Sequence, residues 1–162
     1  MLRSVYIIWK IKKMSEKENL HLQTGGSVVI NAQYIKDFSF ENPNAPYSLI
    51  KSEKPYIDID LDVRADHIHD SMFEVVINVR VQSSASKPIF VIELAYGGLF
   101  TIEGEITVEA KEIILLVHCA NILFPYVRRV ISDATCDGGY PPLLLSPVDF
   151  MGLYQQKKMT AN

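Results

Sequence analysis

Histidine and carboxylate side chains that could bind a metal ion lie together in the segment ADHIHDS, residues 65–71. His67 and His69 would share one face of an extended chain, with Asp66 and Asp70 nearby, and zinc sites use these residue types. The composition of this segment is typical of a turn between strands, and the sequence places no third ligand beside it. We therefore expect no metal site and no cofactor.

Three further features are typical of catalytic sites, and each is incomplete. His118 and Cys119 are adjacent, but neighbouring helix residues point about 100° apart, so they do not form a nucleophile–base pair. The glycines of GGLFTIEGE (97–105) match neither GxGxxG nor the P-loop pattern. The many carboxylates alternate with apolar residues and are expected at the surface, whereas catalytic carboxylates need burial or a partner. We expect no catalytic residues, and a protein that is not an enzyme.

The first half of the chain alternates apolar and polar residues, which predicts β-strands. Four segments show the alternation, roughly at residues 28–41, 56–64, 72–82 and 88–96. In the first, Tyr34, Phe38 and Phe40 are expected to face the core. The short link SSASKP (83–88) favours antiparallel pairing of the last two strands. The longer link at residues 41–55 contains three prolines and is expected to be a loop.

The same alternation places a row of acidic residues on the outer face of the predicted sheet. A solvated sheet face explains most of them. The alternative is a docking surface for a basic partner. The outward-facing acidic residues are Asp37, Glu41, Asp58, Asp60, Asp62, Glu74 and Glu93.

From about Val108 to Ala134, apolar residues recur at helical spacing and predict a long helix. This helix is apolar on most sides, so we expect it between layers or at a subunit interface. Pro125 should kink it, because proline has no N–H to donate to the carbonyl of Asn121. The glycines after Asp137 should end it, and a shorter helix should begin near Pro147. Four strands followed by two helices predict an α+β fold with a four-stranded antiparallel sheet.

Size and charge limit the possible function classes. A chain of 162 residues fits one domain. Outside residues 1–13 the chain has 12 basic and 19 acidic residues, and this acidic balance argues against nucleic-acid binding. The uncharged run from Ile113 to Val127 is shorter than the ~20 residues that cross a bilayer. With two thiols and no disulfide framework, we expect a cytoplasmic protein without stable membrane insertion.

The first thirteen residues, MLRSVYIIWKIKK, differ from the rest of the chain because they are basic and apolar. We interpret them as a disordered tail or as the result of a start codon placed too early. A weak anchor on a membrane surface is the alternative. We therefore divide the chain into a poorly ordered extension at residues 1–27, a folded domain at residues 28–156 and a flexible tail at residues 157–162.

The segment DGGYPPLLLSPVDF, residues 137–150, combines five large apolar residues with three prolines. The prolines exclude a single helix or a central strand. This segment, together with YIKDFSFENPNAP (34–46), GGLF (97–100) and ANILFPYVRRVIS (120–132), resembles the SecB family of bacterial protein-export chaperones. The resemblance covers about residues 28–156, in the same order and spacing.

The resemblance implies an α+β chaperone that binds unfolded precursor proteins without ATP and delivers them to SecA, the export ATPase. It also implies a homotetramer, arranged as a dimer of dimers with long helices packed between sheets. Irregular backbone held by prolines can wall an apolar groove without offering a free strand edge. The candidate client-binding residues are Phe40, Tyr47, Tyr56, Ile57, Tyr140, Leu143, Leu145, Val148, Phe150 and Tyr154, several of which are expected to fill the core instead.

By the same resemblance, the residues that bind SecA are Asp37, Glu41, Val91 and Glu93. The residues expected at the oligomer interface are Ile92, Leu94, Tyr96 and Phe124. The chain departs from the family at Glu53, where many relatives have tryptophan, and in its short basic C-terminus. The alternative function is an adaptor, or a SecB-like chaperone dedicated to one partner such as a toxin–antitoxin system.

Overall fold

The computed structural model describes residues 19–21, 26–50 and 54–160. Most of the predicted N-terminal extension, residues 1–18 and 22–25, lies outside the described residues, as do Glu53 and residues 161–162. The elements in chain order are β1 (Asn19–His21), β2 (Ser27–Glu41), α1 (Tyr47–Ile50), β3 (Tyr56–His69), β4 (Met72–Ser84), β5 (Pro88–Glu103), α2 (Val108–Ile113), the π-helical segment η1 (Ile114–Cys119), α3 (Ala120–Asp137) and α4 (Phe150–Thr160). The α+β class is confirmed, and the four long strands precede the long helix and α4, while the four-residue α1 lies within the predicted loop.

The sheet has the strand order β1-β2-β5-β4-β3, and all neighbouring strands are antiparallel. Four long strands form most of the sheet. The three-residue β1, which lies in the predicted N-terminal extension, pairs at one edge. The strands β3, β4 and β5 are joined by tight turns, the first with Asp70 at φ 49°. The link after β2 carries the chain to the far edge of the sheet, because β2 pairs with β5 and not with β3.

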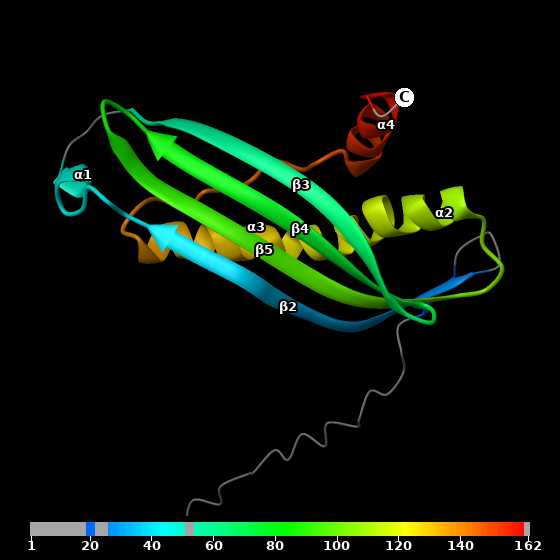
Figure 1. Ribbon diagram of the computed structural model, residues 1–162. Coiled ribbons are helices and arrows are strands. Elements are labelled where there is room, and N and C mark those ends of the chain that lie inside the picture. Colours follow the sequence, from blue (N-terminus) through cyan, green and yellow to red (C-terminus); the bar gives the residue numbers. More distant parts are fainter. Residues whose placement is uncertain (1–18, 22–25, 51–53, 161–162) are drawn as a thin grey trace, which may run out of the picture.

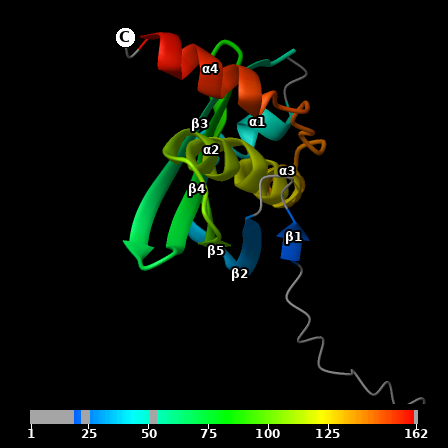
Figure 2. The ribbon, with the colours of Figure 1, turned by 90° about the vertical axis from the view of Figure 1, so that its right-hand side faces the viewer.

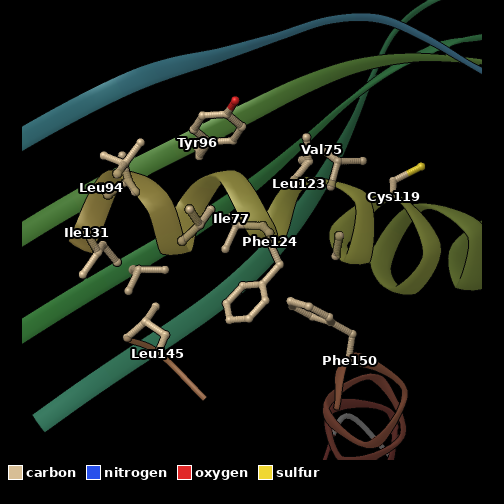
Figure 3. Packing of buried hydrophobic residues seen from close by; sticks show 14 of the residues in the cluster. Val75, Ile77, Leu94, Tyr96, Cys119, Leu123, Phe124, Ile131, Leu145 and Phe150 are labelled. Carbon is tan, nitrogen blue, oxygen red and sulfur yellow. The ribbon is translucent and has the colours of Figure 1, made fainter. Parts of the chain in front are cut away.

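The molecule has two layers, with the helices on one face of the sheet. Figure 1 shows α3 running behind the strands, and Figure 2 shows β3 and β4 on the left with α3 on the right. In Figure 3, Leu94 and Tyr96 of β5 point toward Leu123 and Ile131 of α3. The core therefore lies between sheet and helix, and the described helices leave the other sheet face, here called the outer face, uncovered.

The long helix runs from Val108 to Asp137, and its hydrogen-bond pattern changes at Ile114–Cys119. Pro125 lies inside α3. The segment η1, which ends just before α3, is π-helical, and the sequence did not indicate this. Length and composition alone would let this helix cross a membrane, but half of its most apolar window is buried within the chain. The helix is therefore placed as the core helix of a folded domain.

The glycine pair that follows Tyr96 allows close approach on both faces of β5. A Cβ atom at Gly98 would lie 2.7 Å from Leu123 Cδ2 on the helix side. A Cβ atom at Gly97 would lie 2.7 Å from Tyr34 Cε2 on the outer face. A larger side chain at Gly98 would displace the Phe100 ring and the Leu123 side chain, and one at Gly97 would displace the Tyr34 ring.

One predicted orientation on β2 is wrong. The pairing with β5 shifts between Ile35 and Asp37, which is a β-bulge with Lys36 as the extra residue. Tyr34 therefore lies on the outer face, where its hydroxyl donates to Glu74, and not with Phe38 and Phe40 on the helix side. A simple alternation of faces cannot show the bulge, because the inserted residue reverses the alternation beyond it.

Candidate functional site

An open apolar hollow of about 640 Å³, here called the crossover hollow, lies at the end of the sheet beside α1. Figure 1 shows that α3 also ends there. One wall comes from α1 and Pro55, another from the β4–β5 turn and the start of β5, and a third from residues 139–143. The main lining residues are Tyr47, Leu49, Pro55, Ile57, Pro88, Ile89, Phe90, Tyr140, Pro141, Pro142 and Leu143.

Tyr140 joins two walls of the crossover hollow. Its hydroxyl donates to Asn42 Oδ1 at 2.7 Å and lies 2.9 Å from Ser48 Oγ. Asn42 also donates its side-chain amide to the carbonyl of Gly138 at 3.2 Å. The Tyr140 ring packs against Phe90, with 5.1 Å between ring centroids. These contacts fix the segment after α3 against the segment after β2.

The irregular segment after α3 is held by one buried threonine. The N–H of Leu143 donates to Thr135 Oγ1 at 3.0 Å, and the N–H of Tyr140 donates to the Thr135 carbonyl at 3.0 Å. The Thr135 hydroxyl itself donates to the Ser132 carbonyl at 2.9 Å. A segment with three prolines has few donors of its own, so these bonds keep it ordered without strand pairing.

The ten predicted groove residues fall into three groups. Tyr47, Ile57, Tyr140 and Leu143 line the crossover hollow, while Phe40 stacks behind it on Phe90. Tyr56 is 71% exposed beside Ile57. The remaining four belong elsewhere: Leu145 is 4% exposed in the core, Val148 packs against the core, and Phe150 and Tyr154 line a second hollow.

The sequence prediction missed Leu49, Ile89 and Phe90 as wall residues. Leu49 lies in the proline-rich link, so its position in that loop was the available signal. Phe90 was assigned to the core by alternation, and it is indeed buried. Only the pairing of β2 with β5 shows that the start of β5 borders the loop that follows β2.

The second hollow, of about 510 Å³, lies between β3, η1 and α4. Its apolar floor includes Leu61, Leu115 and Phe150. Phe150 also meets Phe124 edge-on, with 5.6 Å between ring centroids, as Figure 3 shows.

Polar contacts at its rim hold the end of α4. Tyr154 donates to Glu112 at 2.9 Å, Lys158 pairs with Glu109 at 2.9 Å, and Lys157 pairs with Asp62. The helix runs to Thr160, past the boundary at residue 156 that we predicted for the flexible tail.

The four predicted SecA-binding residues lie together on the outer face. Glu41 is opposite Val91, Asp37 is opposite Ala95, and Glu93 is two residues from Val91 along β5. Glu93 forms an ion pair with Arg80 at 2.6 Å, and both side chains are about half exposed. Asp37, Asp60, Asp62, Arg80 and Glu93 border a shallow acidic trough of about 490 Å³.

Glu74 differs from the other outward-facing acidic residues because it is 8% exposed. Its carboxylate accepts hydrogen bonds from the Lys36 ammonium at 2.6 Å and from the Tyr34 hydroxyl at 2.5 Å. These bonds lower the pKa of Glu74, while burial and the bond to Glu74 raise the pKa of Tyr34 to about 12. Glu74 is therefore ionised and fully paired at neutral pH.

The assignment of four residues to the oligomer interface stays a prediction. Ile92, Leu94, Tyr96 and Phe124 are all buried within the single chain. They face the chain's own helix layer, and the Tyr96 ring stacks on Tyr126 at 6.0 Å. Within the single chain, these side chains therefore belong to the contact between the sheet and its own helices.

The metal and thiol candidates have structural contacts. His67 Nε2 lies 2.9 Å from the carbonyl of Asp70, and its ring packs on Phe73. Within the described residues, no group of three His, Cys, Asp or Glu side chains could hold a metal ion. Cys119 is buried, which raises the pKa of its thiol to about 12, whereas Cys136 is exposed.

Residues 21–161 match the model of the family described as preprotein translocase subunit SecB. The chain is 45% identical over 132 residues to the protein-export protein SecB of Rhodospirillum centenum, covering 80% of this chain and 79% of that protein. It is 46% identical over 127 residues to the Bartonella bacilliformis protein of the same name, covering 77% of this chain and 79% of that one.

A solved structure also shares the fold. The SecB-like chaperone Rv1957 of Mycobacterium tuberculosis, in complex with a peptide from the HigA1 antitoxin, matches with a TM-score of 0.62 at 20% identity. The match covers 75% of this chain and 90% of that one. At this level of identity the likeness concerns the fold alone.

Proposed function

Because this chain belongs to the SecB family of protein-export chaperones, we propose that it is an ATP-independent holdase that binds unfolded precursor proteins in the cytoplasm. The crossover hollow is the observation that supports this proposal. It is open and apolar, and four prolines, at positions 55, 88, 141 and 142, form part of its wall. An unfolded chain exposes scattered apolar side chains, and such a wall can bury them without pairing as a strand edge.

Loose specificity follows from the energetics of such binding. Each client side chain that is buried contributes about 1–3 kcal/mol, and ordering the client costs part of this gain. In the proposed homotetramer, a dimer of dimers, four hollows would contact one client. The second and later contacts then benefit from a high effective concentration.

The acidic trough would serve the next step, the transfer of the client to SecA. Asp37, Glu41, Val91 and Glu93 would bind the basic, zinc-bearing end of SecA. A negatively charged face attracts a basic segment at long range and fixes its position. The trough lies on the outer face, so SecA could dock while the crossover hollow still holds a client.

A refolding experiment tests the holdase proposal. A denatured, slow-folding precursor is diluted without ATP into increasing amounts of the full chain, and both refolding and aggregation are followed. We expect both to stop near one tetramer per client. Unhindered refolding at an excess of the protein would contradict the proposal.

Two exposed leucines provide a matched pair of variants for the same experiment. Leu49 is 47% exposed and lines the crossover hollow, whereas Leu144 is 67% exposed and lies outside it. Neither change removes a core residue, so both variants should fold. Leu49→Ser should weaken client retention, and Leu144→Ser should leave it close to that of the unchanged chain.

A second candidate function is a chaperone or adaptor dedicated to one partner. The observation that favours it is the antitoxin peptide bound by the Mycobacterium tuberculosis chaperone of the same fold. A scan with several unrelated unfolded proteins separates the two functions. A holdase for export binds most of them, whereas a dedicated chaperone binds one and ignores the rest.

A further inference from the structure

We propose that Glu74 is a positioning residue for partner docking, because it anchors the β-bulge at Lys36 that turns Asp37 toward the outer face. The inference rests on the proposed docking of SecA at the acidic trough. It assigns a role there to three residues, Tyr34, Lys36 and Glu74, that do not border the trough.

Glu74 connects two strands that are not neighbours in the sheet. Glu74 lies on β4, while Tyr34 and Lys36 lie on β2, and β5 runs between these strands. One carboxylate oxygen accepts from the Tyr34 hydroxyl and the other from the Lys36 ammonium, at 2.5 and 2.6 Å. Hydrogen bonds that involve charged groups are stronger than neutral ones, and more so when buried. Glu74 thus clamps β2 across the outer face of β5.

This clamp encloses the bulge. Ile35 lies opposite Tyr96, and Asp37 lies opposite Ala95, the next residue of β5. Lys36 is therefore the residue without its own position in the pairing, and its ammonium group is bound by Glu74. A bulge leaves its extra residue unpaired and re-aims the side chains beside it, so a contact to that residue acts on the bulge itself.

The bulge decides on which face of the sheet Asp37 lies. Without the extra residue, Lys36 would take the place opposite Ala95 and Asp37 would lie opposite Leu94. Leu94 faces the helix side, and Phe38 now occupies the place opposite it, so Asp37 would turn away from the outer face. A shift of one residue exchanges the two faces of a strand. The bulge is therefore what allows Asp37 to border the acidic trough together with Glu93.

Gly97 completes the arrangement. The Tyr34 ring lies directly over this residue, and a Cβ atom there would lie 2.7 Å from Cε2 and 3.0 Å from Cζ of the ring. Only a residue without a side chain lets the ring cross β5 and bring its hydroxyl to Glu74. Beyond the bulge, the N–H of Phe38 donates to Asp37 Oδ1 at 3.0 Å, which orients the Asp37 carboxylate.

The test compares Glu74→Gln with Asp66→Asn in the full chain. Asp66 lies opposite Glu74 on β3, on the same face, and its side chain is about half exposed. Both variants lose one negative charge, but only the first loses the clamp. Tyr34→Phe, which keeps the ring, is a second clamp variant and does not require Glu74 to change. Thermal melting checks that each variant folds.

Two readouts are measured for each variant. Amide hydrogen exchange at residues 36–38 should become faster in Glu74→Gln and Tyr34→Phe and stay unchanged in Asp66→Asn. Calorimetry with the basic C-terminal segment of SecA should show about fivefold weaker binding for the clamp variants. In an Asp37→Asn background, Glu74→Gln should cause almost no additional loss, because Glu74 acts through Asp37.

The outcomes separate this inference from the proposed function. If the unchanged chain does not bind the SecA segment, docking at the trough is wrong, and the exchange rates alone decide whether Glu74 anchors the bulge. If the unchanged chain binds but Glu74→Gln behaves like Asp66→Asn in both readouts, the inference is overturned. Independent, additive losses from Glu74→Gln and Asp37→Asn would also overturn it.

Discussion

Tyr140 shows how one side chain can serve both stability and binding. Its ring belongs to the wall of the crossover hollow, and its hydroxyl connects the segments that form two of the walls. The hydroxyl contacts are partly buried. Without this hydroxyl, Asn42 and Ser48 would lose a hydrogen-bond partner that water replaces incompletely. The shape of the hollow should therefore depend on an atom that does not face the client.

We expect Tyr140→Phe to lower the free energy of unfolding by about 1–2 kcal/mol, because it removes a hydrogen-bond partner from two partly buried polar side chains. Urea unfolding at neutral pH measures the change. Tyr56→Phe removes the same atom from a side chain that is 71% exposed and should change stability by less than about 0.5 kcal/mol. Equal losses in both variants would show that the hydroxyl of Tyr140 does not connect the walls.

The buried carboxylate of Glu74 should make stability depend on pH in the acidic range. Hydrogen bonds from Lys36 and Tyr34 lower the pKa of Glu74 below its ordinary value of 4.5. Its stabilising effect is therefore complete above the pKa of the unfolded chain and is lost as the pH falls through the lower pKa of the folded chain. We expect the stability difference between the unchanged chain and Glu74→Gln to be largest near neutral pH and to shrink below about pH 4. Urea unfolding at several pH values measures it, and a difference independent of pH would contradict the assignment.

At the scale of elements, α4 is attached in two different ways. Its first residue, Phe150, is 2% exposed and packs on Phe124, whereas its last turn is held by surface pairs of Lys157 and Lys158. Exposed ion pairs contribute little to stability, because water and salt screen them. The apolar anchor should therefore dominate.

We expect Phe150→Ala to destabilise the chain by about 3–5 kcal/mol, in the range of large-to-small core changes. Lys157→Gln combined with Lys158→Gln should cause a much smaller loss that disappears in high salt. Thermal or urea unfolding at low and high salt measures both effects. A larger loss from the lysine changes than from Phe150→Ala would mean that the ion pairs hold α4.

The elements also show how far the sequence alone leads. Alternation predicted β3, β4 and β5 because both the pattern and the strands are regular there. It failed at Tyr34, because a bulge is decided by contacts across the sheet, here with Glu74 and Gly97. The π-helical segment was missed for a similar reason, since its residues have ordinary helical spacing.

Residues of the candidate site could be predicted where their position depends on neighbours in the sequence. They could not be predicted where their position depends on contacts with distant segments. Tyr140 and Leu143 could be found because prolines mark their segment as irregular, and they do line the hollow. Leu145 has the same neighbours in sequence but turns into the core. Which of two nearby leucines faces a hollow depends on the hydrogen bond between Leu143 and Thr135, and sequence spacing does not contain that information.

At the scale of the whole molecule, the two proposed binding regions are separate. The crossover hollow lies at the end of the sheet beside α1, and the acidic trough lies on the outer face around Arg80 and Glu93. Neither shares a lining residue with the other. A change in one region should therefore leave the other intact. A chaperone that holds a client while it meets SecA needs this independence.

We expect Glu93→Lys to weaken the binding of SecA by about tenfold or more and to leave client retention unchanged. The change replaces a carboxylate in the trough by an ammonium group. The new positive charge repels a basic partner, and it repels Arg80, which pairs with Glu93 in the unchanged chain. Calorimetry with SecA at two salt concentrations, together with the refolding assay, measures both properties. Glu103→Lys makes the same charge change at the far end of β5, outside the trough, and should have little effect. Equal losses in the two variants would indicate general charge attraction, and unchanged affinity in Glu93→Lys would exclude docking at the trough.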